Sequence, residues 1–108
     1  MDGIQASRLV QVAQFGEFCL DFRRMELSRS DQPIELTLRE FKVLKFLAQN
    51  PRRVFTRDQI LDSVWNNNAF VEARTVDVHI SRLRNQIETD PQKPKYILTV
   101  RGIGYKFL

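Results

Sequence analysis

The sequence predicts a single α+β domain: an N-terminal four-stranded antiparallel sheet, a bundle of three helices and a C-terminal β-hairpin. Three observations predict it. Apolar and polar residues alternate in the first third, as in strands that are buried on one face. Two capping boxes and a helical spacing of apolar residues follow, and two short apolar runs around a pair of glycines end the chain. A chain of 108 residues is long enough for one domain with its own core.

The strands are expected to begin at Val12, where the alternation starts. Phe18, Leu20 and Phe22 would lie on one face of a strand, with Cys19 and Asp21 on the other. The segments 25–27 (MEL) and 34–36 (IEL) repeat the alternation on either side of SRSDQP, which has a turn composition. Residues 1–11 have no clear period and are interpreted as a linker or the remnant of an upstream domain, so the folded domain is assigned to 12–108.

Two helices are expected to start at capping boxes. Thr37 and Glu40 form the first box, and the helix LREFKVLKFLAQN should end before Pro51. Its apolar residues face more than one direction, so it should be packed on two sides. Residues 53–55 can form one short strand. Thr56 and Gln59 form the second box, and this helix should end at the three asparagines 66–68.

A third helix is predicted for RTVDVHISRLRNQIE, residues 74–88. At about 100° per residue, its apolar positions fall within roughly 40° of one another and form a narrow seam toward the core. The seam consists of Val76, Ile80, Leu83 and Ile87. The opposite side consists of Thr75, Val78, Ser81, Arg82 and Asn85.

The hairpin is expected to pair residues 96–100 with 105–107 around RGIG, whose two glycines would supply positive φ angles. Helices joined by a loop and followed by a β-hairpin form a winged helix-turn-helix.

Charge is distributed unevenly along the chain. Residues 1–36 hold four Arg and six acidic residues, whereas residues 37–108 hold thirteen Lys and Arg and seven acidic residues. A basic second part is typical of a domain that faces a polyanion, although a solvated basic surface explains the charge alone equally well.

The outward side of the third helix carries residue types that recognise base edges in the major groove of DNA. Arg82 can bridge O6 and N7 of guanine, Asn85 can pair with adenine, and Val78 can contact a thymine methyl group. Arg74 and the flanking His79 and Arg84 are placed for phosphate contacts, which set the register of a protein on DNA.

RTVDVHISRLRNQIE, TVRGIGYKF and LTLREFKVLKFLAQNPRRVFTRDQILDSVW together resemble the C-terminal DNA-binding (effector) domain of OmpR/PhoB-type response regulators. The resemblance covers roughly residues 14–107. It implies that the third helix enters the major groove and that the hairpin forms a wing whose Arg101 reaches the minor groove. The implied contacts to the DNA backbone are Arg74, Thr75, His79, Ser81, Arg84, Thr99, Gly102 and Tyr105. Ser81 stands where some members carry a second arginine.

The resemblance also implies partners. The loop before the third helix corresponds to a segment that contacts RNA polymerase in some members; its candidate residues are Asn66, Asn67, Asn68, Phe70 and Glu72. Members act in the bacterial cytoplasm, at the nucleoid, and bind direct repeats in double-stranded DNA as head-to-tail dimers, while the isolated domain is expected to be a monomer. A receiver domain, phosphorylated by a sensor kinase, usually lies upstream, so residues 1–11 would be the remnant of its linker. No cofactor or metal is implied.

Two other classes of function fit the sequence less well. An enzyme needs a nucleophile with a base, paired carboxylates or a metal cluster, and the single histidine, His79, has no such partner in the sequence. A winged helix that binds RNA polymerase or another regulator without reading DNA would lack the basic outward face, whereas Arg82 and Arg101 are present. Trp65, Phe70 and Val71 can belong either to a partner surface or, for the two aromatic residues, to the edge of the core. No run of the sequence is long and apolar enough to cross a membrane.

Overall fold

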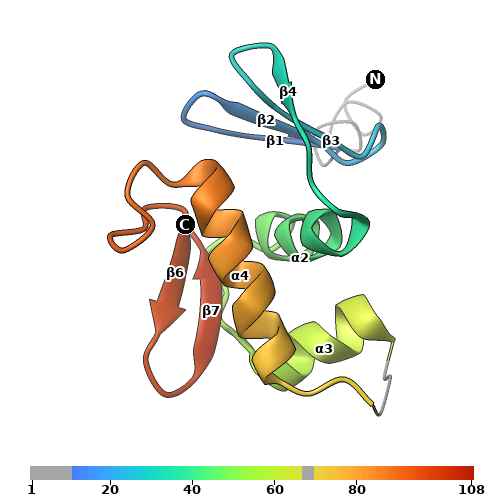
Figure 1. Ribbon diagram of the computed structural model, residues 1–108, viewed down its shortest axis with the longest axis vertical. Coiled ribbons are helices and arrows are strands. Elements are labelled where there is room, and N and C mark those ends of the chain that lie inside the picture. Colours follow the sequence, from blue (N-terminus) through green and yellow to red (C-terminus); the bar gives the residue numbers. More distant parts are fainter. Residues whose placement is uncertain (1–10, 67–69) are drawn as a thin grey trace, which may run out of the picture.

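The computed structural model describes residues 11–66 and 70–108, and it contains two sheets and three helices in that part of the chain (Figure 1). The elements are β1 (Val12–Phe15), β2 (Phe18–Asp21), β3 (Glu26–Arg29), β4 (Gln32–Ile34), α2 (Leu38–Ala48), β5 (Phe55–Thr56), α3 (Arg57–Trp65), α4 (Arg74–Ile87), β6 (Ile97–Val100) and β7 (Gly104–Phe107). The N-terminal sheet lies over α2 and the C-terminal end of α4, on the side away from α3, and the β6–β7 hairpin lies alongside α4. The predicted α+β winged helix-turn-helix is confirmed.

The N-terminal sheet is an antiparallel meander in the order β1-β2-β3-β4. Its buried face carries Phe18, Leu20 and Leu27, with Leu20 paired to Leu27 across β2 and β3. Phe22 is buried as expected but follows the end of β2, and its N–H donates to the carbonyl of Gln11 at 2.8 Å.

Two strand boundaries differ from the prediction. Met25 does not begin a strand: it has a φ of 54° and lies exposed in the turn before β3, because the chain must reverse within four residues. The last strand runs over residues 32–34 rather than 34–36. Ser30 and Asp31 both take positive φ values, and this short turn pairs Gln32 with Arg29 at once. The pairing therefore starts two residues earlier than the alternation indicated.

Both predicted capping boxes are present. The hydroxyl of Thr37 accepts the N–H of Glu40 at 3.1 Å and the Glu40 carboxylate accepts the N–H of Thr37 at 3.0 Å. Thr56 and Gln59 repeat this exchange at 3.1 and 2.8 Å. Two of the N–H groups that a helix start leaves unpaired are satisfied in each case. The sequence at these positions therefore determines where α2 and α3 begin.

One hydrophobic core joins the three helices to both sheets. The predicted seam of α4 is confirmed, since its four apolar residues are at most 2% exposed. Helix α2 is packed on two sides: Leu44 and Val43 are both fully buried although they point in different directions. Within residues 11–66 and 70–108, no helix is both long and apolar enough to span a membrane.

The C-terminal hairpin belongs to a three-stranded sheet, β5-β7-β6. The short strand expected at 53–55 instead covers Phe55 and Thr56, and pairs antiparallel with β7. The expectation of two positive φ angles in RGIG is wrong for Gly104: Gly102 has a φ of 78°, whereas Gly104 is required because a Cβ there would lie 1.9 Å from the carbonyl oxygen of Phe55. This glycine allows β5 to approach β7.

Candidate nucleic-acid interface

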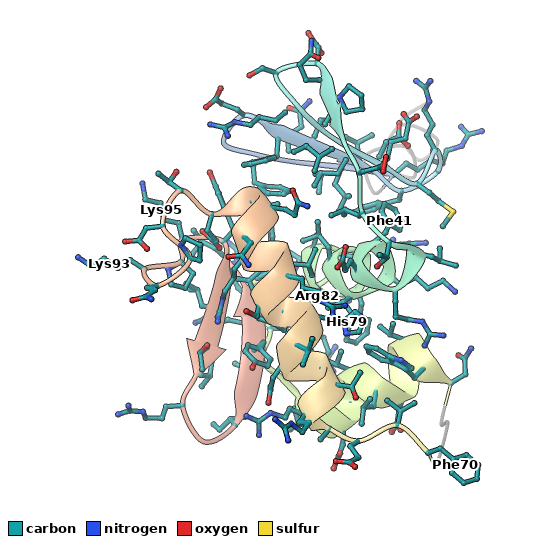
Figure 2. All side chains as sticks on the ribbon, in the orientation of Figure 1. Phe41, Phe70, His79, Arg82, Lys93 and Lys95 are labelled. Atoms are coloured by element: carbon teal, nitrogen blue, oxygen red, sulfur yellow. The ribbon has the colours of Figure 1, made fainter. Side chains whose placement is uncertain are left out.

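The outward side of α4 is accessible and carries the predicted residues. Val78 is 42% exposed, and Ser81, Arg82 and Asn85 are exposed as well. Arg74 is exposed at the first residue of the helix, while Thr75 is half-buried. In Figure 2 Arg82 lies midway along the helix. The strip formed by Val78, Ser81, Arg82 and Asn85 therefore combines an apolar side chain, a hydroxyl, a cation and an amide.

The tip of the hairpin forms a second accessible cationic surface. Arg101, Gly102 and Ile103 make the turn between β6 and β7, and all three are exposed. The N–H of Ile103 donates to the carbonyl of Val100 at 2.9 Å, which closes the turn. The positive φ of Gly102, with open space around its Cβ position, lets Arg101 project beyond the sheet.

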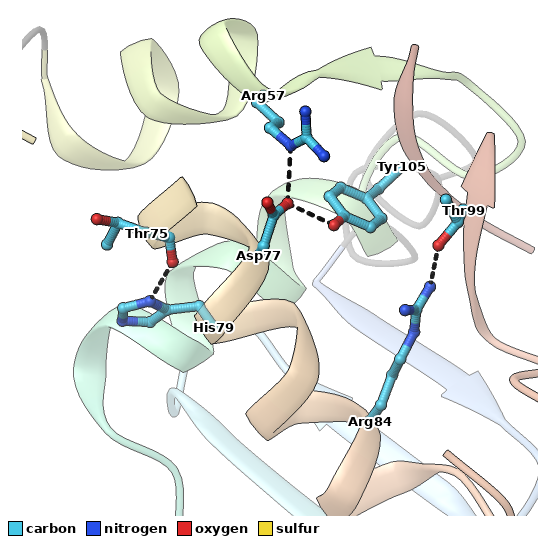
Figure 3. A network of polar contacts seen from close by, with 7 residues as sticks. All are labelled: Arg57, Thr75, Asp77, His79, Arg84, Thr99 and Tyr105. Carbon is cyan, nitrogen blue, oxygen red and sulfur yellow. Dashed lines mark hydrogen bonds and ion pairs between the residues drawn. The ribbon is translucent and has the colours of Figure 1, made fainter. Parts of the chain in front are cut away.

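A polar network ties the hairpin to the start of α4 and to the start of α3 (Figure 3). Oδ1 of Asp77 accepts Nε of Arg57 at 2.8 Å and the hydroxyl of Tyr105 at 2.5 Å. The hydrogen bond and charge of Asp77 raise the pKa of Arg57. Burial, followed by the bond to Asp77, raises the pKa of Tyr105. The sequence pattern did not indicate Asp77 and Arg57, because the partners of Asp77 are 28 and 20 residues away from it.

Arg84 makes a second tie between α4 and the hairpin. Its Nη2 donates to the carbonyl of Ile97 and to Oγ1 of Thr99, both at 2.8 Å, and its Nε donates to the same carbonyl at 3.1 Å. The guanidinium also lies 5.6 Å from the ring centre of Tyr105. Burial lowers the pKa of Arg84. Phosphate contacts by Arg84, Thr99 and Tyr105 stay predictions, and here these side chains bind one another.

His79 lies on the flank of α4, as predicted, and is half-buried. Its Nδ1 is 2.9 Å from the carbonyl oxygen of Thr75, and its ring packs edge-on against Trp65. Trp65 is 9% exposed, and the guanidinium of Arg39 lies 5.1 Å from its ring centre. Trp65 therefore belongs to the edge of the core, where it supports His79.

Glu88 supports the base of the hairpin, which the sequence patterns did not reveal. The predicted third helix included Glu88, whereas α4 ends at Ile87 and the backbone of Glu88 is extended. It follows the last residue of α4 and is 8% exposed. Its carboxylate accepts the backbone N–H groups of Lys95, Tyr96 and Ile97 at 2.7–2.9 Å. This fixes the entry to β6 and hence the base of the hairpin. The signal available in the sequence was an acid directly after an amphipathic helix.

The loop before α4 is described only at its two ends. Asn66 ends α3 with a left-handed φ of 54°. Glu72 is exposed, and Phe70 is 96% exposed and projects from the molecule in Figure 2. Phe70 therefore does not cap the core. The predicted contacts at Asn67 and Asn68 lie outside the described residues.

Comparisons with known proteins agree with this geometry. The profile of the family described as "Transcriptional regulatory protein, C terminal" matches residues 31–107. The chain is 43% identical over 95 residues to the sensory transduction protein RegX3 of Mycolicibacterium smegmatis, covering 88% of this chain and 42% of RegX3. The chain thus spans less than half of that relative.

Solved structures are similar as well, among them the two that follow. The response regulator DrrB, described as a Thermotoga maritima OmpR/PhoB homologue, superposes with a TM-score of 0.83 at 34% identity over 97% of this chain and 51% of that one. The Klebsiella pneumoniae RstA DNA-binding domain, crystallised with the RstA box, gives 0.77 at 28% identity, with 90% and 96% covered. The chain belongs to the family of C-terminal domains of transcriptional regulatory proteins, of the OmpR/PhoB type.

Proposed function

We propose that this domain binds double-stranded DNA in a sequence-specific manner and serves as the output domain of a two-component response regulator. Helix α4 would enter the major groove and the β6–β7 hairpin, the wing, would reach the minor groove. The observation that carries the proposal is the exposed strip of Val78, Arg82 and Asn85 on a helix whose other side is fully buried. RstA, which has the same fold, was crystallised with its DNA.

The exposed residues divide into two kinds of contact. Arg82, Asn85 and Val78 would read base edges, and Arg101 would enter a narrow, A·T-rich minor groove, whose negative potential attracts arginine. The DNA backbone would be contacted by the residues for which the family resemblance implies this role: Arg74, Thr75, His79, Ser81, Arg84, Thr99, Gly102 and Tyr105. Those that are exposed are Arg74, Ser81, Thr99 and Gly102, and Thr75 and His79 are half-buried.

The wider assembly is also a proposal. The domain would be a monomer alone and bind direct repeats as a head-to-tail dimer. A receiver domain upstream, controlled by a sensor kinase, would regulate it in the bacterial cytoplasm, at the nucleoid. The family resemblance suggests that the loop before α4 contacts RNA polymerase, and Phe70, which is 96% exposed, would be accessible for that contact. The expected phenotype of Phe70→Ala is loss of transcription from a bound promoter with unchanged DNA affinity.

Selection of bound duplexes from a random DNA pool tests the proposal. The wild-type chain should enrich one sequence, and its affinity for that duplex should fall steeply with salt, with a slope of roughly −0.9 per neutralised phosphate in a plot of log affinity against log salt. A scrambled duplex of the same composition is the control. Recovery of no preferred sequence, with equal binding to the scrambled duplex, would contradict sequence-specific recognition.

A further inference from the structure

We infer that Asp77 is a positioning residue: it holds the wing against α4 so that Arg101 reaches the minor groove while α4 lies in the major groove. The inference rests on the proposed function, because it assigns a role within DNA binding. It concerns a residue that would not itself contact DNA.

One carboxylate oxygen joins three elements. Oδ1 of Asp77, in the first turn of α4, accepts both Arg57, the first residue of α3, and Tyr105, in β7 (Figure 3). Tyr105 is 7% exposed, so its ring is fixed by packing and its hydroxyl direction is defined. Because the Tyr105 ring is fixed in β7, its hydrogen bond to Asp77 fixes the position of β7 relative to α4.

The base of the wing is held by core contacts of Ile97 and Phe107 and by the hydrogen bonds of Glu88, but the part toward its tip has few other restraints. Strand β7 pairs with β5 at only two positions, Phe55 with Tyr105 and Thr56 with Gly104, and beyond them the hairpin tip projects with Arg101. Within the described residues, side-chain hydrogen bonds tie the hairpin to α4 at two points: Asp77 with Tyr105, and Arg84 with Ile97 and Thr99. The Asp77 bond lies on the half of α4 that begins with Arg74, whereas Arg84 holds the other half.

The charge of Asp77 argues for such a role. A carboxylate on a helix that faces phosphates is repelled by DNA, since like charges a few ångströms apart interact unfavourably. Its ion pair with Arg57 is solvent-exposed and contributes little to stability by itself. A purely electrostatic view therefore predicts tighter binding when Asp77 is neutralised. A positioning role predicts instead that the contribution of Arg101 is lost.

A double-mutant cycle separates the two views, using the full chain and the duplex that the wild type selects from a random pool. Arg101→Ala should lower the affinity of the wild type roughly tenfold, within the range for one base-reading arginine. In the Asp77→Ala background, Arg101→Ala should lower the affinity by less than about twofold. The difference between these two effects, expressed as a free energy, is a coupling energy large enough for a double-mutant cycle to resolve. Arg82→Ala should cost the same in both backgrounds.

Matched variants separate positioning from a change of net charge and from a loss of folding. Asp62→Ala, at an exposed acid of α3, changes the net charge equally and should leave the Arg101 effect intact. Asp77→Asn keeps an acceptor oxygen, so in the Asp77→Asn background Arg101→Ala should lower the affinity nearly as much as it does in the wild type. Tyr105→Phe removes only the hydroxyl and should repeat the Asp77→Ala result, which keeps the test valid if Asp77→Ala does not fold.

Two failures are distinguishable. If the wild type selects no sequence, the proposed function is wrong. If it selects one and Arg101→Ala costs the same in the wild-type, Asp77→Ala and Tyr105→Phe backgrounds, the positioning role is wrong and DNA binding stands.

Discussion

The hydroxyl of Tyr105 donates a 2.5 Å hydrogen bond to Oδ1 of Asp77 and so connects the wing to the helix beside it. Burial and this bond raise the pKa of Tyr105 above its ordinary value. The neutral phenol is therefore the form that the folded state favours. The neutral Tyr105 phenol contributes fully to the stability of the fold at pH values below the pKa of tyrosine in the unfolded chain, which is about 10. This contribution is lost as the pH rises through the higher pKa of Tyr105 in the folded chain.

We expect Tyr105 to ionise at a higher pH than an unperturbed tyrosine, and Asp77→Asn to lower its pKa because the negative charge is removed. Absorption of tyrosinate in the near ultraviolet, followed against pH, measures this. Tyr96→Phe leaves Tyr105 as the one tyrosine of the chain and makes the assignment direct. Identical titration curves for Tyr96→Phe with and without Asp77→Asn would show that the hydrogen bond does not stabilise the neutral phenol.

Replacing Glu88 with alanine should destabilise the fold by about 2–4 kcal/mol, because three N–H groups at the entry to β6 lose their acceptor. Glu88→Gln keeps one acceptor oxygen and should be intermediate. Urea unfolding measures both. Glu72→Ala, at an exposed acid, is the control and should change stability by less than about 0.5 kcal/mol. Equal stability of Glu88→Ala and Glu72→Ala would contradict the role of Glu88.

Gly104→Ala and Gly102→Ala should differ although the two glycines are only two residues apart, Gly102 in the hairpin turn and Gly104 at the start of β7. A Cβ at Gly104 meets the backbone of Phe55, which cannot move away without breaking the β5–β7 pairing, so we expect a loss of about 3 kcal/mol. At Gly102 the space is open and only the positive φ opposes alanine, at about 1 kcal/mol. Denaturant midpoints compared at one temperature test the order, and the reverse order would be inconsistent with it.

Arg82→Ala should relax discrimination at one base pair by about 1–3 kcal/mol without changing the melting temperature. Binding to duplexes that carry each of the four base pairs at every position identifies the affected one. Substituting alanine for the exposed Lys93, in the loop after α4, supplies a control with the same charge change. Wild-type binding by both Arg82→Ala and Arg101→Ala would show that α4 and the wing are not the reading surface.

Arg84→Ala should act on stability rather than on the salt dependence of binding. Its guanidinium donates three hydrogen bonds to the hairpin, so we expect a loss of about 1–3 kcal/mol in unfolding free energy. A phosphate contact would instead reduce the salt slope by roughly one. Measuring both quantities for Arg84→Ala decides between the tie to the hairpin and the phosphate contact that the family resemblance implies.

Local patterns predicted the elements well where the cause is local. The capping boxes at Thr37 and Thr56 form within four residues, so the starts of α2 and α3 were predictable. The seam of α4 follows from a 3.6-residue repeat and is buried as expected. Strand boundaries were less predictable, since Met25 alternates correctly but occupies a left-handed turn conformation set by the chain reversal.

The candidate site divides in the same way. That Val78, Arg82 and Asn85 face outward followed from the helical period alone, and their exposure agrees. The sequence by itself determined the kind and order of the elements, the outward strip of α4 and the tip of the hairpin, because each depends on neighbours within a few residues. Only the tertiary structure decided that Asp77 meets Tyr105, that Arg84 binds the hairpin and that Gly104 makes room for Phe55. Those contacts join residues distant in sequence, and their partners are chosen by the packing of the whole domain.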